Sequence, residues 1–143
     1  MLQKNIVGID HIALQLPDLD EGLRFFNELL GFKVKFETVF EGQKIVMLQA
    51  GKIEIEMWEH REGVEESAPA PANGVHHVAI GVKGLDDAMA HARSAGLDIL
   101  ADVYEPTRGI REAIVRGPGG TRIQFVEQNV PLLIWRAITG DFK

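Results

Sequence analysis

The stretch IDHIALQLPDLDEGLRFFNELLGFKV at 9–34 aligns with the stretch VHHVAIGVKGLDDAMAHARSAGLDIL at 75–100. Further along the chain, GKIEIEMWE at 51–59 aligns with GTRIQFVEQ at 120–128. The offset between the paired stretches stays nearly constant, and self-similarity of this kind indicates one structural unit that occurs twice.

Each copy predicts one strand, one helix and three further strands. In residues 6–16 and 75–82, core-facing apolar residues recur at every second position, and both segments are rich in Ile, Val and Leu, which is typical of strands. In the first copy Asp18 and Glu21 form a capping pair at the start of the helix, and Gly31 ends it. The remaining strands are expected at 33–40, 43–50, 52–58, 98–104, 111–116 and 121–127. The predicted fold is α+β, with two tandem βαβββ modules whose curled mixed sheets form a cleft.

The repeat also predicts how the chain is organised. We expect a single domain in which module one spans about 6–60 and module two about 75–128. The segment REGVEESAPAPANG at about 61–74 has the Pro, Ala, Gly and charge content of a linker. The C-terminal tail at 129–143 lies outside the repeat and is apolar enough to need burial, either over the cleft or against another subunit.

Composition excludes several classes of protein. The 143 residues include no cysteine, so a disulfide framework and a thiolate metal site are both excluded. A net charge of −6 without a basic stripe argues against nucleic-acid binding. No apolar run reaches the roughly 18 residues of a membrane span, and the first residues lack the pattern of a secretory leader. We therefore expect a cytoplasmic protein with no membrane partner.

Strand alternation selects two histidines. In the first strand Ile12, Leu14 and Leu16 form the row expected to pack on the helix, so His11 faces the other way. In the strand at 75–82 the same argument makes His77 face away from the helix. His76 has the opposite parity and is not expected to be a ligand.

The last strand of each copy adds an oxygen donor on the same face. Glu56 and Gln124 occupy equivalent positions, whereas Glu127 has the wrong parity. Two imidazoles and two oxygen donors suit one divalent ion such as Zn, Ni, Co, Mn or Fe(II), and the lack of thiolates argues against a closed structural zinc site. The competing interpretation is a cleft that keeps this geometry and binds no metal.

Four further residues are candidates for substrate binding. Arg122 has the parity of Gln124 and is suited to an anionic group, and Glu54 and Trp58 have the parity of Glu56. Arg108 belongs to a run of arginines that alternatively represents solvated strand-edge charge.

The chain from about Ile6 to Glu127 resembles the vicinal oxygen chelate superfamily, which includes glyoxalase I, methylmalonyl-CoA epimerase, fosfomycin and bleomycin resistance proteins, and extradiol dioxygenases. The motifs that carry the resemblance are DHIAL at 10–14, FFNELLGF at 25–32, IEM at 55–57, VHHVAI at 75–80 and GPGGTRIQFVE at 117–127. The resemblance places the metal at His11, Glu56, His77 and Gln124. It also implies that the chain binds a small-molecule substrate and forms a homodimer.

One position departs from the pattern of the isomerases that this chain resembles. Glyoxalase I and methylmalonyl-CoA epimerase usually have a glutamate base at the place of Gln124, and an amide takes up no proton. Glu56 is then the catalytic base of the expected metal-dependent isomerase or lyase. Two alternatives stay open, namely a non-catalytic resistance-type binding protein and an Fe(II) dioxygenase.

Overall fold

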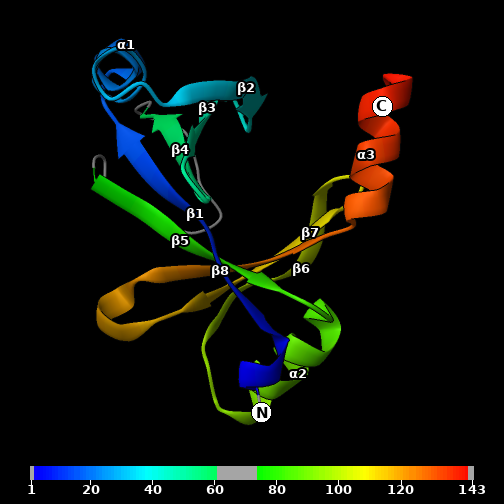
Figure 1. Ribbon diagram of the computed structural model, residues 1–143. Helices are drawn as coiled ribbons and strands as arrows, with labels where there is room; N and C mark the ends of the chain where they lie inside the picture. The colour runs from blue at the N-terminus through cyan, green and yellow to red at the C-terminus, as the bar shows by residue number, and fades with distance from the viewer. Residues whose placement is uncertain (1, 61–73, 142–143) are drawn as a thin grey trace. The chain divides into compact units, whose positions relative to one another are not determined.

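The computed structural model describes residues 2–60 and 74–141, and its secondary structure confirms the predicted fold class (Figure 1). The first copy consists of β1 (Ile6–Leu16), α1 (Leu19–Leu23), the π-helical segment η2 (Arg24–Leu29), β2 (Lys33–Phe40), β3 (Gln43–Ala50) and β4 (Ile53–Glu59). The second copy consists of β5 (Gly74–Val82), α2 (Leu85–Ser94), β6 (Ile99–Thr107), β7 (Ile110–Arg116), the short turn η3 (Pro118–Gly120) and β8 (Arg122–Gln128). The short helix η1 (Leu2–Asn5) precedes them and α3 (Val130–Thr139) follows. The βαβββ pattern therefore occurs twice, with strand ends within about three residues of those predicted.

The chain divides into two compact units, and β1 and β5 each run from one into the other. The 9–79 unit contains the end of β1, all of β2, β3 and β4, and the first part of β5. The 80–141 unit also includes residues 2–8. The predicted linker at 61–74 lies outside the described residues except for its last position.

The sheet is mixed, as predicted. In the 9–79 unit the strand order is β2-β3-β4-β1, in which β3 is antiparallel to both neighbours and β1 is parallel to β4. In the 80–141 unit β8, β7 and β6 follow β5 in the strand order and pair antiparallel to one another. The parallel β1·β4 pair is possible because a helix and two strands connect these strands.

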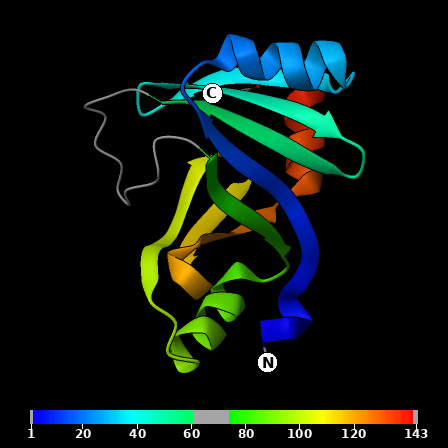
Figure 2. The ribbon, with the colours of Figure 1, turned by 90° about the vertical axis from the view of Figure 1, so that its left-hand side faces the viewer.

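The helix of the first copy packs on one face of its own strands, as Figure 2 shows for α1 and η2 over β2, β3 and β4. Asp18 caps this helix by accepting hydrogen bonds from the backbone N–H groups of Asp20 and Glu21. The buried core between helix and sheet consists of Leu19 from α1, Val46 and Leu48 from β3, and Met57 from β4. Gly22 lies so close to the sheet that an added Cβ would be 2.6 Å from Cδ1 of Leu16.

The helix of the second copy packs in the same way. The buried residues of this core are Val82, Leu85, Met89, Ala92, Ala113, Val115 and Phe125. Glu127 reaches the same side of the sheet, where its Oε1 accepts hydrogen bonds from the backbone N–H groups of Gly84 and Leu85 at the start of α2. A carboxylate at a helix N-terminus is favourable, so Glu127 has a structural role on the face that its parity indicates.

The C-terminal tail forms α3, which Asn129 caps through a hydrogen bond from the N–H of Leu132. The largest apolar residues of this tail are not buried within their own unit. Ile134, Trp135 and Ile138 are exposed, while Arg136 is buried and donates to backbone oxygens of Arg108 and Asp141. Helical periodicity explains the difference, because only one stripe of the helix contacts the rest of its unit. Burial over the cleft or against another subunit stays a prediction, and so does the homodimer.

Within the described residues, no helix is both long enough and apolar enough to cross a membrane.

Candidate metal centre

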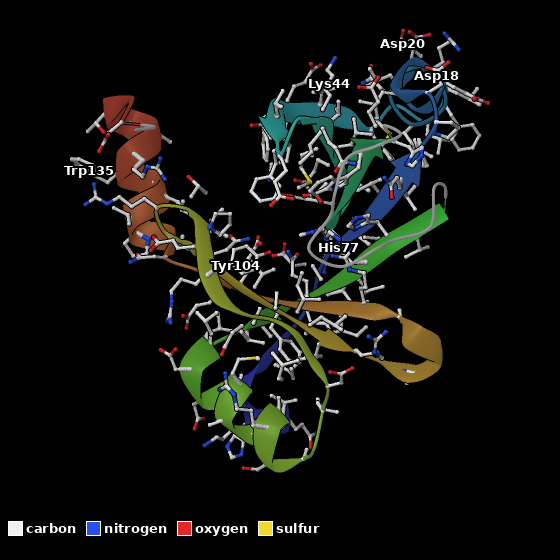
Figure 3. All side chains as sticks on the ribbon, turned by 180° about the vertical axis from the view of Figure 1, so that it is seen from behind. Asp18, Asp20, Lys44, His77, Tyr104 and Trp135 are labelled. Carbon is white, nitrogen blue, oxygen red and sulfur yellow. The ribbon has the colours of Figure 1, made fainter. Side chains whose placement is uncertain are left out.

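Three potential metal ligands meet in the 9–79 unit. His11 comes from β1, Glu56 from β4 and His77 from β5, and their ligand atoms all lie within 4.8 Å of one another. The Nε2 atoms of the two histidines are 3.0 Å apart. Glu56 Oε2 lies 3.8 Å from Nε2 of His11, and Glu56 Oε1 lies 3.7 Å from Nε2 of His77. Figure 3 labels His77 on its strand.

The local structure explains why these side chains converge. The parallel register pairs Ala13 with Glu56, two residues beyond His11 on the same face of β1. Ala13 is fully buried and small, which leaves room beside it for the carboxylate. His11 and His77 are 5% and 3% exposed. Strand alternation therefore positions the three side chains in an interior where water has little access.

The histidine geometry fits a divalent cation. Metal–nitrogen bonds of about 2.0–2.1 Å correspond to ligand–ligand separations of roughly 2.9–3.4 Å in octahedral or tetrahedral sites. The observed 3.0, 3.7 and 3.8 Å separations lie close to that range. On its other side His11 contacts Oδ2 of Asp10 through Nδ1 at 2.8 Å, an arrangement that leaves Nε2 as a donor to a metal.

Glu56 has one oxygen held by a neighbour. The indole N–H of Trp58, two residues along the strand, donates a hydrogen bond to Oε1 of Glu56. Burial raises the pKa of Glu56 above its ordinary value, and the nearby His11 and the Trp58 hydrogen bond only partly offset this effect. A carboxylate buried in this way favours a cation beside it.

Gln124 lies on β8 in the 80–141 unit, where its environment fixes the orientation of its amide. Its Nε2 donates to Oε2 of Glu112 at 2.9 Å. A carboxylate only accepts hydrogen bonds, so the amide nitrogen must face Glu112. The amide Oε1 is buried and has no hydrogen-bond partner among the described residues. This oxygen fits an outside donor or cation, and the assignment of Gln124 as fourth ligand stays a prediction.

Two residues near Gln124 were missed by sequence reasoning. Tyr104 on β6 is paired in register with Glu112 on β7, and it hydrogen-bonds both Glu112 and Gln124. Burial and the charge of Glu112 raise the pKa of Tyr104 above its usual range. Figure 3 labels Tyr104. Strand parity could have placed Glu112 on the face of Gln124, but the irregular register of β6 hid Tyr104.

The remaining predicted substrate-binding residues lie in different environments. Arg122 is buried on β8 and shares the face of Gln124. Glu54 forms an ion pair with Lys35. Arg108 is exposed beside Asp141, with 3.6 Å between Nη1 and the carboxylate. Among these candidates, Trp58 is in hydrogen-bonding contact with a predicted metal ligand, Glu56.

One relative is similar to this chain in sequence, and another is similar in both sequence and fold. It is 26% identical over 150 residues to 2-epi-5-epi-valiolone epimerase from an Actinomyces species, an alignment that covers 87% of this chain and 80% of that protein. It is 27% identical to Streptomyces coelicolor methylmalonyl-CoA epimerase in complex with 2-nitronate-propionyl-CoA, with a TM-score of 0.70 and coverage of 87% and 99%.

A further structure is similar in fold. Methylmalonyl-CoA epimerase from Mycobacterium tuberculosis is 21% identical, with a TM-score of 0.75 and coverage of 92% of this chain and 94% of that one. The family model of the Glyoxalase/Bleomycin resistance protein/Dioxygenase superfamily matches residues 8–125, which include all four predicted ligands. The chain therefore belongs to the Glyoxalase/Bleomycin resistance protein/Dioxygenase superfamily.

Proposed function

We propose that this protein is a metal-dependent isomerase of the epimerase type, which moves a proton at a carbon next to a carbonyl or carboxylate oxygen of a small oxygenated substrate. The observation that carries the proposal is the convergence of Glu56 with the Nε2 atoms of His11 and His77 in a buried site. A divalent cation bound there would supply Lewis acidity, which lowers the barrier to removing such a proton.

The residues of the site have distinct roles in this proposal. His11 and His77 would hold the cation through Nε2, and Gln124 would serve as a neutral oxygen ligand. Glu56 takes the proton from carbon and returns it, since it is the carboxylate in the predicted ligand set. Trp58 holds Oε1 of Glu56, so Oε2 is the oxygen that exchanges the proton.

The comparisons support this reaction class. The sequence relative from Actinomyces is named an epimerase, and the structural relative from Streptomyces acts on a coenzyme A thioester according to its name. Arg122 lies on the face of Gln124 and would contact an anionic part of the substrate.

Deuterium exchange tests the proposal. The protein loaded in turn with Zn, Ni, Co, Mn and Fe(II) is incubated in deuterated buffer with methylmalonyl-CoA, 2-epi-5-epi-valiolone, and the hemithioacetal of methylglyoxal and glutathione. We expect deuterium to enter next to the carbonyl of at least one probe, and only with metal. Glu56→Gln should abolish this exchange, whereas Glu37→Gln, which removes an exposed carboxylate on β2 paired with Lys44, should not.

Two results would overturn the proposal. Full exchange by Glu56→Gln would exclude Glu56 as the base, and a protein that binds none of the five metals would favour the resistance-type binding role. Two histidines and one carboxylate also form the ligand set of non-haem Fe(II) oxygenases. Oxygen consumption with a catechol, in the presence of Fe(II) and not of Zn, would assign the protein to that class instead.

A further inference from the structure

Each predicted ligand histidine is directly preceded by a residue that contacts its Nδ1. In the first copy Oδ2 of Asp10 lies 2.8 Å from Nδ1 of His11. In the second copy Nδ1 of His76 lies 2.8 Å from Nδ1 of His77. Asp10 and His76 occupy equivalent positions in the repeat, so the same contact is made by a carboxylate in the first copy and by an imidazole in the second.

The contact matters because of the imidazole tautomer. A neutral histidine that offers Nε2 to a cation carries its proton on Nδ1, and that proton needs an acceptor. Asp10 is an acceptor by virtue of its carboxylate. His76 accepts at Nδ1 only when its own proton is on Nε2, so the 2.8 Å contact restricts the tautomers of both rings.

His76 is held in place from the other side. It is 5% exposed, and its ring stacks on the indole of Trp58 with centroids 5.1 Å apart and an angle of 5° between the planes. The same indole donates its N–H to Glu56. One aromatic ring therefore contacts both the residue beside His77 and the carboxylate of Glu56.

We propose that His76 is a positioning residue, which accepts the Nδ1–H of His77 and thereby presents Nε2 of His77 to the cation. Trp58 fixes the plane of His76 and the orientation of Glu56 together. The inference rests on the proposed metal site, but it does not depend on any particular reaction.

Metal affinity in matched variants tests the positioning role. His76→Phe retains a ring that stacks on Trp58 and removes the acceptor, whereas His76→Asn retains an acceptor atom near the position of Nδ1. We expect His76→Phe to weaken Co(II) affinity, measured by competition with a chelator, by about 10- to 100-fold. His76→Asn should stay within about threefold of the parent, because it restores the acceptor. His91→Phe, at a half-buried position of α2 in the 80–141 unit, is the control and should not change the affinity.

Nitrogen NMR of the zinc-loaded protein supplies a signature that a merely structural role would not produce. We expect the proton on Nδ1 of His77 and a scalar coupling across the hydrogen bond to Nδ1 of His76. A proton located instead on Nδ1 of His76, or a Co(II) affinity of His76→Phe equal to that of the parent, would overturn the inference. If His76→Phe does not fold, the NMR measurement on the parent still decides. Since neither readout involves turnover, failure of the proposed isomerase would be seen separately in the deuterium-exchange assay.

Discussion

The contact between Gln124 and Glu112 predicts what happens if the usual glutamate of the related isomerases is restored. Gln124→Glu replaces a hydrogen bond of 2.9 Å by two carboxylates at the same separation. At an effective dielectric constant of 20, two like charges at this distance repel by about 6 kcal/mol. Separation of the flexible side chains to roughly 6 Å leaves about 3 kcal/mol. We expect the variant to lose about this much of its free energy of unfolding at pH 8.

Urea unfolding of the metal-free protein measures this loss, and a double-mutant cycle identifies its cause. In the Glu112→Gln background, Gln124→Glu recreates one carboxylate facing one amide, so most of the stability should return. The loss of stability should also be smaller at acidic pH, where one of the two carboxyl groups is protonated and donates a hydrogen bond to the other. Gln128→Glu makes the same chemical change at the exposed end of β8 and is the control.

Two results would refute this reasoning. One is an equal loss from Gln124→Glu with and without Glu112, which would show that the two side chains are not coupled. The other is a Gln124→Glu variant as stable as the parent at pH 8, which would show that Glu112 does not destabilise a carboxylate at position 124.

Three further predictions concern the 9–79 unit. Folding raises the pKa of Glu56, so its contribution to stability is present at low pH and is lost as pH rises through the folded pKa. The metal-free Glu56→Gln variant lacks this titration and should become more stable than the parent as pH increases above about 4.5, measured by urea unfolding. Trp58→Phe keeps the ring and removes the N–H donor that lowers the pKa of Glu56, so carbon NMR should detect a carboxyl titration at higher pH than in the parent. Gly22→Ala places a Cβ 2.6 Å from Cδ1 of Leu16 and should lower the free energy of unfolding by about 1–3 kcal/mol, measured by thermal unfolding. Gly81→Ala is the control, because the nearest atom to its added Cβ is 3.6 Å away, and it should lower the free energy of unfolding by less.

Much of the fold and part of the site follow from local patterns in the sequence. Period-two alternation assigns His11 and Glu56 to the face opposite the helix, and it assigns Glu127 to the helix side, where the structure finds it capping α2. These results depend only on the geometry of a single strand, in which neighbouring side chains point to opposite faces. The internal repeat assigned His77 and Gln124 to the corresponding face of the second copy, because they align with His11 and Glu56.

The partners of these residues were decided by tertiary structure alone. The stacking of His76 on Trp58 and the hydrogen bond from Gln124 to Glu112 each join side chains on two different strands, so they depend on how those strands align. Parity set His76 apart from the expected ligands, but it did not show that His76 contacts one of them, His77. Alternation determines the face that a side chain occupies, whereas the side chain that lies beside it depends on how separate strands align, and no local period encodes that alignment.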